Sequence, residues 1–183
     1  MNTVELIHHS LGFAFDVLEQ LVSDLTQEQA DWMPPGNANP ISALYWHTVS
    51  YVDQIVHDWG MGHRAPKVNY TQSIRKSAGW QEKVVIACPP VDPEDPMEDL
   101  RAIHEGLRVD LAALHDYARA TRQALLGWVA SLTPEDMARK IETTIGELTV
   151  GQFLEAYVIW HINVHCGEIA ALKGCQGLKG YPW

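Results

Sequence analysis

Two histidines near the end of the sequence have the spacing of a metal chelate. His161 and His165 lie four residues apart in a stretch whose apolar residues recur at helical spacing, and side chains at i and i+4 share one face of an α-helix. Two imidazoles placed in this way can bind one metal ion at Zn–N distances of about 2.0–2.1 Å. The spacing alone leaves another interpretation open, because many histidine pairs in helical proteins are packed or surface residues.

A catalytic metal site usually has three protein ligands and one open position, so a third ligand is expected on a facing helix. Among the other histidines, only His47 lies on the apolar stripe of a long predicted helix, residues 41–59, between Leu44 and Tyr51. A lone histidine on such a face is more often a hydrogen-bonded core residue than a ligand. His57 lies about 80° around the same helix and is a weaker candidate.

The remaining histidines are interpreted as solvated. His8 and His9 are adjacent, so they diverge by about 100° around a helix and cannot form a chelate. His104 and His115 are eleven residues apart, among charged residues. We expect both to lie on the surface.

Four long amphipathic segments could position such a site, at residues 3–23, 41–59, 96–131 and 149–174. Their apolar residues recur at steps of three and four, which predicts helices with one buried face each. With no convincing sheet, the sequence predicts an all-α four-helix bundle in one domain, residues 1–183.

Cap signals mark where these helices should begin. Asn2 with Glu5, and Thr149 with Gln152, have capping-box spacing, as does the start of a short turn at Thr26. The third helix is predicted to begin at Asp95, followed by proline, and to run to about residue 131. Its length, about 50 Å, makes a kink or break plausible.

Smaller signals lie between and after the long helices. Thr133 should cap a short helix, Gly146 should turn a small hairpin within 140–149, and Gly174 should close the last helix. The segment 60–96 is rich in glycine and proline and is long for a connection inside a domain, which predicts a lid or a contact surface.

Composition limits the class of protein. The chain has 183 residues, 46% of them hydrophobic, and a net charge of −10, which argues against a nucleic-acid backbone or an anionic membrane as partner. Three cysteines without framework spacing and an N-terminus without a signal peptide predict a cytoplasmic location. No apolar run approaches the roughly 18 residues that span a bilayer. Small-molecule substrates fit better.

The motifs resemble a known family. The run Ile41-Ser-Ala-Leu-Tyr-Trp-His47, and the later His161-x-x-x-His165-Cys-Gly-Glu-Ile169 pattern, are similar to those of the DinB-like (YfiT-like) superfamily of metal-binding bundles. The resemblance covers nearly the whole chain. It implies a left-handed up-down-down-up bundle, often a homodimer, with His47, His161 and His165 binding a divalent metal, commonly nickel or zinc. The connection between the second and third helices is longer than the resemblance leads us to expect.

The resemblance also implies chemistry. Characterised relatives include thiol-dependent transferases and isomerases that use low-molecular-weight thiols. We therefore expect a thiol-dependent S-transferase or a small-molecule hydrolase in which the metal acts as a Lewis acid. The alternative is a non-catalytic metal-binding or stress-response interaction protein. In a third interpretation, the three histidines are ordinary core residues.

Four further residues lie within about one turn of these ligands. Glu168 could orient a ligand, act as a base, or be solvated. Tyr51 and Tyr157 could line a pocket or belong to the core. Cys166 follows a proposed ligand and should be a packed thiol rather than a redox residue.

Overall fold

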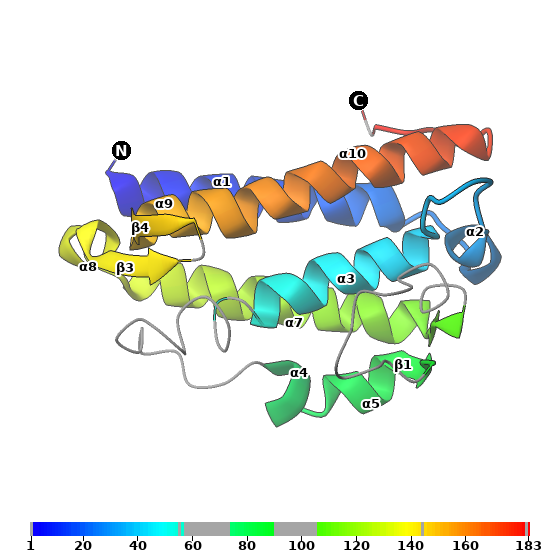
Figure 1. The fold of residues 1–183 in the computed structure, drawn as a ribbon, viewed down its shortest axis with the longest axis horizontal. Coiled ribbons are helices and arrows are strands. Elements are labelled where there is room, and N and C mark those ends of the chain that lie inside the picture. The colour runs from blue at the N-terminus through cyan, green and yellow to red at the C-terminus, as the bar shows by residue number, and fades with distance from the viewer. Residues whose placement is uncertain (1, 55, 57–73, 90–105, 144, 182) are drawn as a thin grey trace.

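Four long helices form the body of the molecule (Figure 1). The structure, a computed structural model, describes residues 2–54, 56, 74–89, 106–143, 145–181 and 183. The long helices are α1 (Thr3–Val22), α3 (Ile41–Gln54), α7 (Leu111–Ser131) and α10 (Trp160–Cys175). Both α1 and α3 pack against α7 and α10, which closes the bundle. The predicted all-α fold is confirmed.

Short elements connect and extend these helices. They are α2 (Gln27–Asp31), α4 (Ile74–Ser77), α5 (Trp80–Val84), α8 (Pro134–Ala138), α9 (Val150–Phe153), the π-helix η2 (Leu154–Ile159), and the strands β1 (Val85–Ala87), β2 (Arg108–Val109), β3 (Lys140–Thr143) and β4 (Gly146–Thr149). β1 pairs with β2, and β3 pairs with β4, both antiparallel. The predicted hairpin around Gly146 is therefore confirmed.

Contacts at the helix ends define the directions of three helices. Near the end of α10, Lys173 donates a 2.7 Å hydrogen bond to the Leu21 carbonyl at the end of α1, so these helices run the same way. The Leu111 amide at the start of α7 donates a 3.0 Å bond to Gln27, just beyond α1, so α7 runs the opposite way. The complete left-handed up-down-down-up connectivity stays a prediction.

The helix starts follow the predicted cap chemistry. Capping boxes form at Asn2 with Glu5, at Thr26 with Gln29, and at Thr149 with Gln152, and the Thr133 side chain caps α8. Each satisfies backbone N–H groups that a first turn leaves without a partner. Local sequence therefore determines these boundaries.

The core follows the predicted apolar stripes. On α1 the stripe residues Ile7, Leu11, Phe15, Leu18 and Val22 are all buried. On α3, Leu44 and Thr48 are buried, and the Thr48 hydroxyl donates a 2.7 Å bond to the Leu44 carbonyl. A buried hydroxyl is tolerated because the backbone supplies its acceptor.

The predicted third long helix is interrupted, in line with the break that its length made plausible. Strand β2 interrupts the expected helix, and the Asp110 side chain caps α7 by accepting a 2.9 Å bond from the Ala113 amide. Helical spacing does not reveal this break, because Leu107 and Leu111 stay on one apolar stripe on either side of it. The predicted start at Asp95, and the end of the second helix at residues 57–59, lie outside the described residues.

The last helix ends later than predicted. Gly174 remains helical, and Gly177 (φ 73°) adopts the left-handed conformation instead. The Leu178 amide bonds to the Lys173 carbonyl at 2.9 Å, and Gly177 to Gly174 at 3.0 Å, which is the Schellman pattern.

Part of the segment 60–96 packs on the bundle. Asp53, 2% exposed, accepts hydrogen bonds from the backbone amides of Ile74 (3.2 Å) and Arg75 (2.9 Å) at the start of α4, and from the Tyr117 hydroxyl (2.7 Å). The Trp80 ring on α5 lies 5.7 Å from that of Tyr117. Trp80 therefore packs on the bundle, and the lid or contact role of the segment stays a prediction.

Among the residues that the structure describes, no helix is both long and apolar enough to cross a bilayer.

Candidate metal centre

Three imidazoles from two helices converge on one point. His47 projects from α3, and His161 and His165 project from α10. One ring nitrogen from each lies within 4.8 Å of the others, and the ring centroids are 4.5–5.1 Å apart. Ligand nitrogens around a tetrahedral zinc lie roughly 3.4 Å apart, so small side-chain rotations would close the set around an ion.

The environment of His161 tests whether these residues fit a metal ion. Its Nε2 atom is buried and lacks a hydrogen-bond partner within the described part of the chain, which is unusual for a buried polar atom. Burial first, and then His165 and His47, lower the pKa of His161 to about 3. The imidazole is therefore neutral at pH 7 and offers the lone pair that a metal ligand needs.

Glu168 contacts the second histidine of α10. Its Oε2 atom lies 2.5 Å from His165 Nδ1, across three residues of one helix. When Nδ1–H donates to the carboxylate, Nε2 carries the lone pair, as in the carboxylate–histidine pairs of metal sites. His165 is largely enclosed, with 14% of its side chain exposed, while half of the Glu168 side chain is exposed. The geometry favours the orienting role.

His47 departs from the expectation of a core-facing residue. It is exposed, whereas the two histidines of α10 are half-buried. The apolar stripe of α3 predicted its approximate direction but not its exposure. A metal ion held partly by an exposed His47 would be accessible from solvent.

Of the two tyrosines that could line the site, Tyr51 adjoins the histidines. The Tyr51 ring stacks on His161, with centroids 4.0 Å apart, and Tyr157 stacks on Phe153 at 5.1 Å. Burial raises the pKa of Tyr51, with Tyr157 adding to the effect. Both phenols are half-buried, and a phenol can donate a hydrogen bond to a group held beside the histidines.

A π-helix lies directly before the two histidines of α10. Residues Leu154–Ile159 form η2, where one continuous α-helix is predicted. Its i→i+5 bonding turns the following residues about the axis relative to an uninterrupted α-helix, and such segments occur often at functional sites. Sequence periodicity missed it, because the apolar spacing of Leu154, Val158 and Ile162 also fits an α-helix.

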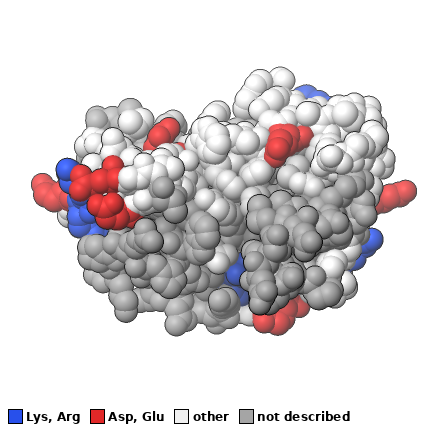
Figure 2. Space-filling view, viewed as in Figure 1, with Lys and Arg blue, Asp and Glu red and all other residues white. Residues whose placement is uncertain are grey.

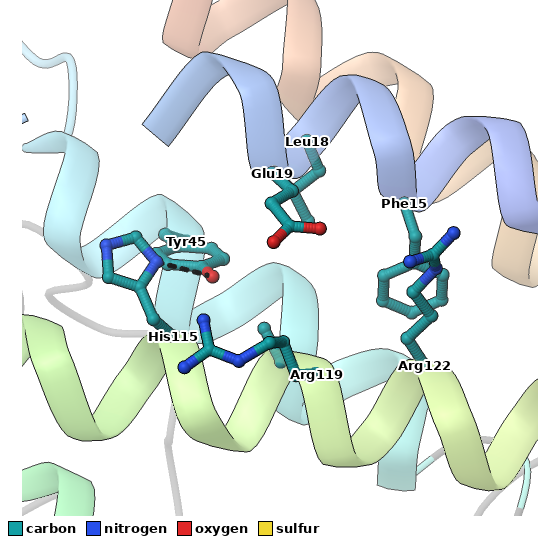
Figure 3. Close-up of a pocket in the computed structure, with 8 residues that line it drawn as sticks. Phe15, Leu18, Glu19, Tyr45, His115, Arg119 and Arg122 are labelled. Atoms are coloured by element: carbon teal, nitrogen blue, oxygen red, sulfur yellow. Dashed lines mark hydrogen bonds between the residues drawn. The ribbon is translucent and has the colours of Figure 1, made fainter. Parts of the chain in front are cut away.

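The other described histidines lie elsewhere. His8 and His9 are on α1, half-buried and exposed respectively. His115 was expected at the surface but is half-buried, because its Nδ1 atom pairs with the Tyr45 hydroxyl at 3.2 Å. This pair lines a cavity of about 10 Å³ between α1, α3 and α7 (Figure 3), large enough for about one water molecule. His57 and His104 lie outside the described residues.

The cysteines contribute no reactive group at the centre. Cys166 is buried, and burial raises its pKa to about 12, so it is a protonated, packed thiol. Cys88 and Cys175 are exposed and free. The interpretation of Cys166 as a packing residue agrees with this environment.

The fold and the three converging imidazoles define a class: helical bundles that could hold a metal ion between two helices. The model of the DinB superfamily matches residues 11–169, and the chain belongs to this family. A crystal structure described as a conserved protein from Enterococcus faecalis is similar in fold, with a TM-score of 0.74 and 19% identity over 94% of this chain and 96% of that one. A comparison with curated proteins found no match.

Proposed function

We propose that His47, His161 and His165 bind one divalent metal ion, with nickel or zinc the best candidates, and that the chain uses it as an enzyme. The observation that carries the proposal is the buried, unpartnered Nε2 atom of His161, within 4.8 Å of ligand atoms from two further imidazoles. A buried ring nitrogen without a hydrogen-bond partner is costly unless something occupies the space beside it. A metal ion accounts for it.

Three neutral imidazoles would leave such an ion with its full positive charge, so it would supply Lewis acidity toward a thiol or a water molecule. The remaining work belongs to the protein. Glu168 holds His165 in one tautomer, and stacking on Tyr51 fixes the plane of His161. The phenols of Tyr51 and Tyr157 could hydrogen-bond an anionic leaving group or a carbonyl oxygen.

Two reaction classes fit these groups: thiol-dependent S-transfer, with a low-molecular-weight thiol as co-substrate, and hydrolysis of a small substrate. Both need a nucleophile activated near neutral pH, and both need access from solvent, which the exposed His47 leaves open. The Cys166 thiol is protonated at neutral pH, so it does not act as the nucleophile in S-transfer. That nucleophile is the thiol co-substrate. The substrate is therefore expected to be a small molecule.

Elemental analysis of protein purified without a histidine tag tests the metal site. We expect about one divalent ion per chain, lost in His161→Ala. His9→Ala removes an exposed histidine from α1 and serves as the matched control. Absence of stoichiometric metal, or the same metal content in His161→Ala, would contradict the proposal.

A second experiment separates the enzyme from a non-catalytic metal-binding or stress-response interaction protein. Metal-loaded protein is assayed with a panel of thiols and electrophiles and with small esters and amides. Turnover that disappears on chelation and returns with metal supports the enzyme. Stoichiometric metal without turnover across the panel would favour the interaction protein, for which the part of segment 60–96 that packs on the bundle is the best motivation.

A further inference from the structure

An open groove lies at the end of the bundle opposite the β3–β4 hairpin, where α2, the β1–β2 pair and the start of α7 meet (Figure 1). Its volume is about 680 Å³, within the range of about 300–1,000 Å³ that is usual for small-molecule sites. The three histidines of the candidate metal centre are not among its lining residues. This groove, here called the end groove, is lined by residues that include Leu25, Asp31, Ile86, Arg108, Val109 and Asp110.

One side of the end groove is apolar. Leu25 and Val109 are buried in its wall, whereas Ile86 on β1 is 69% exposed. An apolar group that entered the groove would contact the buried wall and remove the isoleucine from water, which is favourable. The end groove therefore favours a ligand with an apolar body.

The Gln27 side chain organises the polar side of the end groove. Its amide nitrogen donates to the Val109 carbonyl at 3.0 Å and to Asp31 Oδ2 at 2.9 Å. Its oxygen accepts a 3.0 Å bond from the Leu111 amide. Both N–H donors of Gln27 are used in this way, so Gln27 has no donor left for the second oxygen of Asp31.

Asp31 presents an acceptor that lacks a donor. Its Oδ1 atom is buried and has no hydrogen-bond partner within the residues that the structure describes, which is unusual for a polar atom removed from water. A ligand with a positively charged N–H group would supply the missing donor and balance the charge of the carboxylate.

The charges of the end groove favour a cation over an anion. Asp31 and Asp110 both line it. The one guanidinium among the lining residues, that of Arg108, donates a 2.8 Å bond to the Leu107 carbonyl. Asp110 accepts a bond from the Ala113 amide at the N-terminus of α7, so the place where a helix usually attracts an anion is already occupied.

The charge of the whole chain points the same way. The net charge is −10, which attracts cations. On the face that Figure 2 shows, the described basic residues lie in small, separate groups rather than in one patch. A small cation is therefore a better ligand for this chain than a large anion.

A metal ion fits the end groove less well than an organic cation. A metal site needs several ligand atoms close together. The three histidines of the candidate metal centre form the only such group of three or more residues found within the described part of the chain. The carboxylates of the end groove belong to no such group, and its apolar wall would contribute nothing to a metal ion.

We propose that the end groove binds a small organic amine that is protonated at neutral pH and carries an apolar body. The ammonium group binds at Asp31, and the apolar body lies against Leu25, Val109 and Ile86. This site is additional to the proposed metal-dependent reaction and does not rest on it, because no proposed metal ligand lines the groove. The two proposals can fail separately.

Titration of the full chain with phenylbutylamine, phenylbutanol and phenylbutyrate, followed by backbone amide chemical shifts, tests the site. The three probes share one apolar body and differ in charge. We expect the amine to bind with a dissociation constant of roughly 0.1–5 mM, about tenfold tighter than the carboxylate. The largest shifts should occur at Leu25, Val109 and Ala112, which line the groove.

Two matched lysine variants test the role of charge. Ile86→Lys adds a positive charge at an exposed position of the groove, so it should weaken amine binding about 5- to 10-fold and strengthen carboxylate binding. Ile145→Lys makes the same change at an equally exposed isoleucine outside the groove and should alter neither. Asp31→Asn should reduce the preference for the amine over the alcohol to less than about twofold.

Circular dichroism establishes that the variants are folded. If Asp31→Asn unfolds, Ile86→Lys decides, because its exposed position tolerates a charge. Absence of saturable shifts at the groove up to about 20 mM amine overturns the proposal, as does a carboxylate that binds as tightly as the amine. Equal effects of the two lysine variants, or shifts confined to residues around the metal centre, also overturn it.

Discussion

Asp53 is a buried carboxylate that joins α3 to α4 and α7, and its replacement by asparagine should destabilise the fold strongly. The carboxylate accepts bonds from two backbone amides and from the Tyr117 hydroxyl, at 2.7–3.2 Å. Burial first, and then the proximity of Asp53, raise the pKa of Tyr117, which agrees with a charged acceptor facing a protonated phenol.

The size of the effect follows from the three donors. Asparagine at position 53 offers one carbonyl oxygen and turns an NH₂ group toward N–H and O–H donors. At least one buried donor then loses its acceptor, and the others lose a charged one, which costs about 2–4 kcal/mol. For a chain of this size, that lowers the melting temperature by about 5–15 °C.

Denaturant unfolding followed by circular dichroism measures this free energy, and hydrogen exchange at residues 74–87 shows whether α4 and α5 detach. Tyr117→Phe should cost about 1–2 kcal/mol, and the double variant should cost less than the two single costs together. Asp116→Asn, at an exposed ion pair with Arg119, should change stability by less than about 0.5 kcal/mol. A cost below about 1 kcal/mol for Asp53→Asn, or strict additivity with Tyr117→Phe, would refute the reasoning.

Three further predictions concern the metal centre and the pH dependence of stability. Glu168→Gln should weaken zinc binding about tenfold in a chelator competition, since its carboxylate orients a ligand but is half exposed, whereas Glu155→Gln should not. Zinc at about 100 times its dissociation constant should stabilise the protein by about 2.7 kcal/mol in thermal unfolding, and His161→Ala should abolish this gain. Burial first, and then Arg119, lower the pKa of His115, so the unfolded chain binds its proton more readily. Stability should therefore fall as the pH drops below about 6.5. In denaturant titrations, the free energy of unfolding of His115→Gln should depend less on pH than that of the wild type.

Cap signals and apolar stripes predicted most of the bundle, because both act over a few residues. The capping box at Thr149 and Gln152 depends only on side chains three residues apart, and it forms as expected. The stripe of α1 is buried for the same reason, since helical geometry alone places Ile7 and Leu11 on one side. Patterns over a few residues are therefore sufficient to predict helix starts and buried helix faces.

The point at which the predicted third helix is interrupted could not be predicted in this way. Asp110 caps α7 directly after β2, and β2 forms by pairing with residues 85–87, more than 20 positions earlier. The Asp110 amide also donates a 2.9 Å bond to the Val84 carbonyl. These strand partners supply the hydrogen bonds that the backbone loses where the predicted helix is interrupted. The helical spacing of apolar residues does not indicate them.

The candidate metal site likewise depends partly on local spacing and partly on contacts between segments that are distant in the sequence. A spacing of four residues places His161 and His165 on one face, but it does not distinguish ligands from packed imidazoles. Packed imidazoles would find hydrogen-bond partners, as His115 does with Tyr45. His161 Nε2 is instead buried without one in the described structure and lies beside an imidazole from another helix. That contrast within one chain, rather than the spacing, is the physical reason to propose that the histidines of α10 bind a metal.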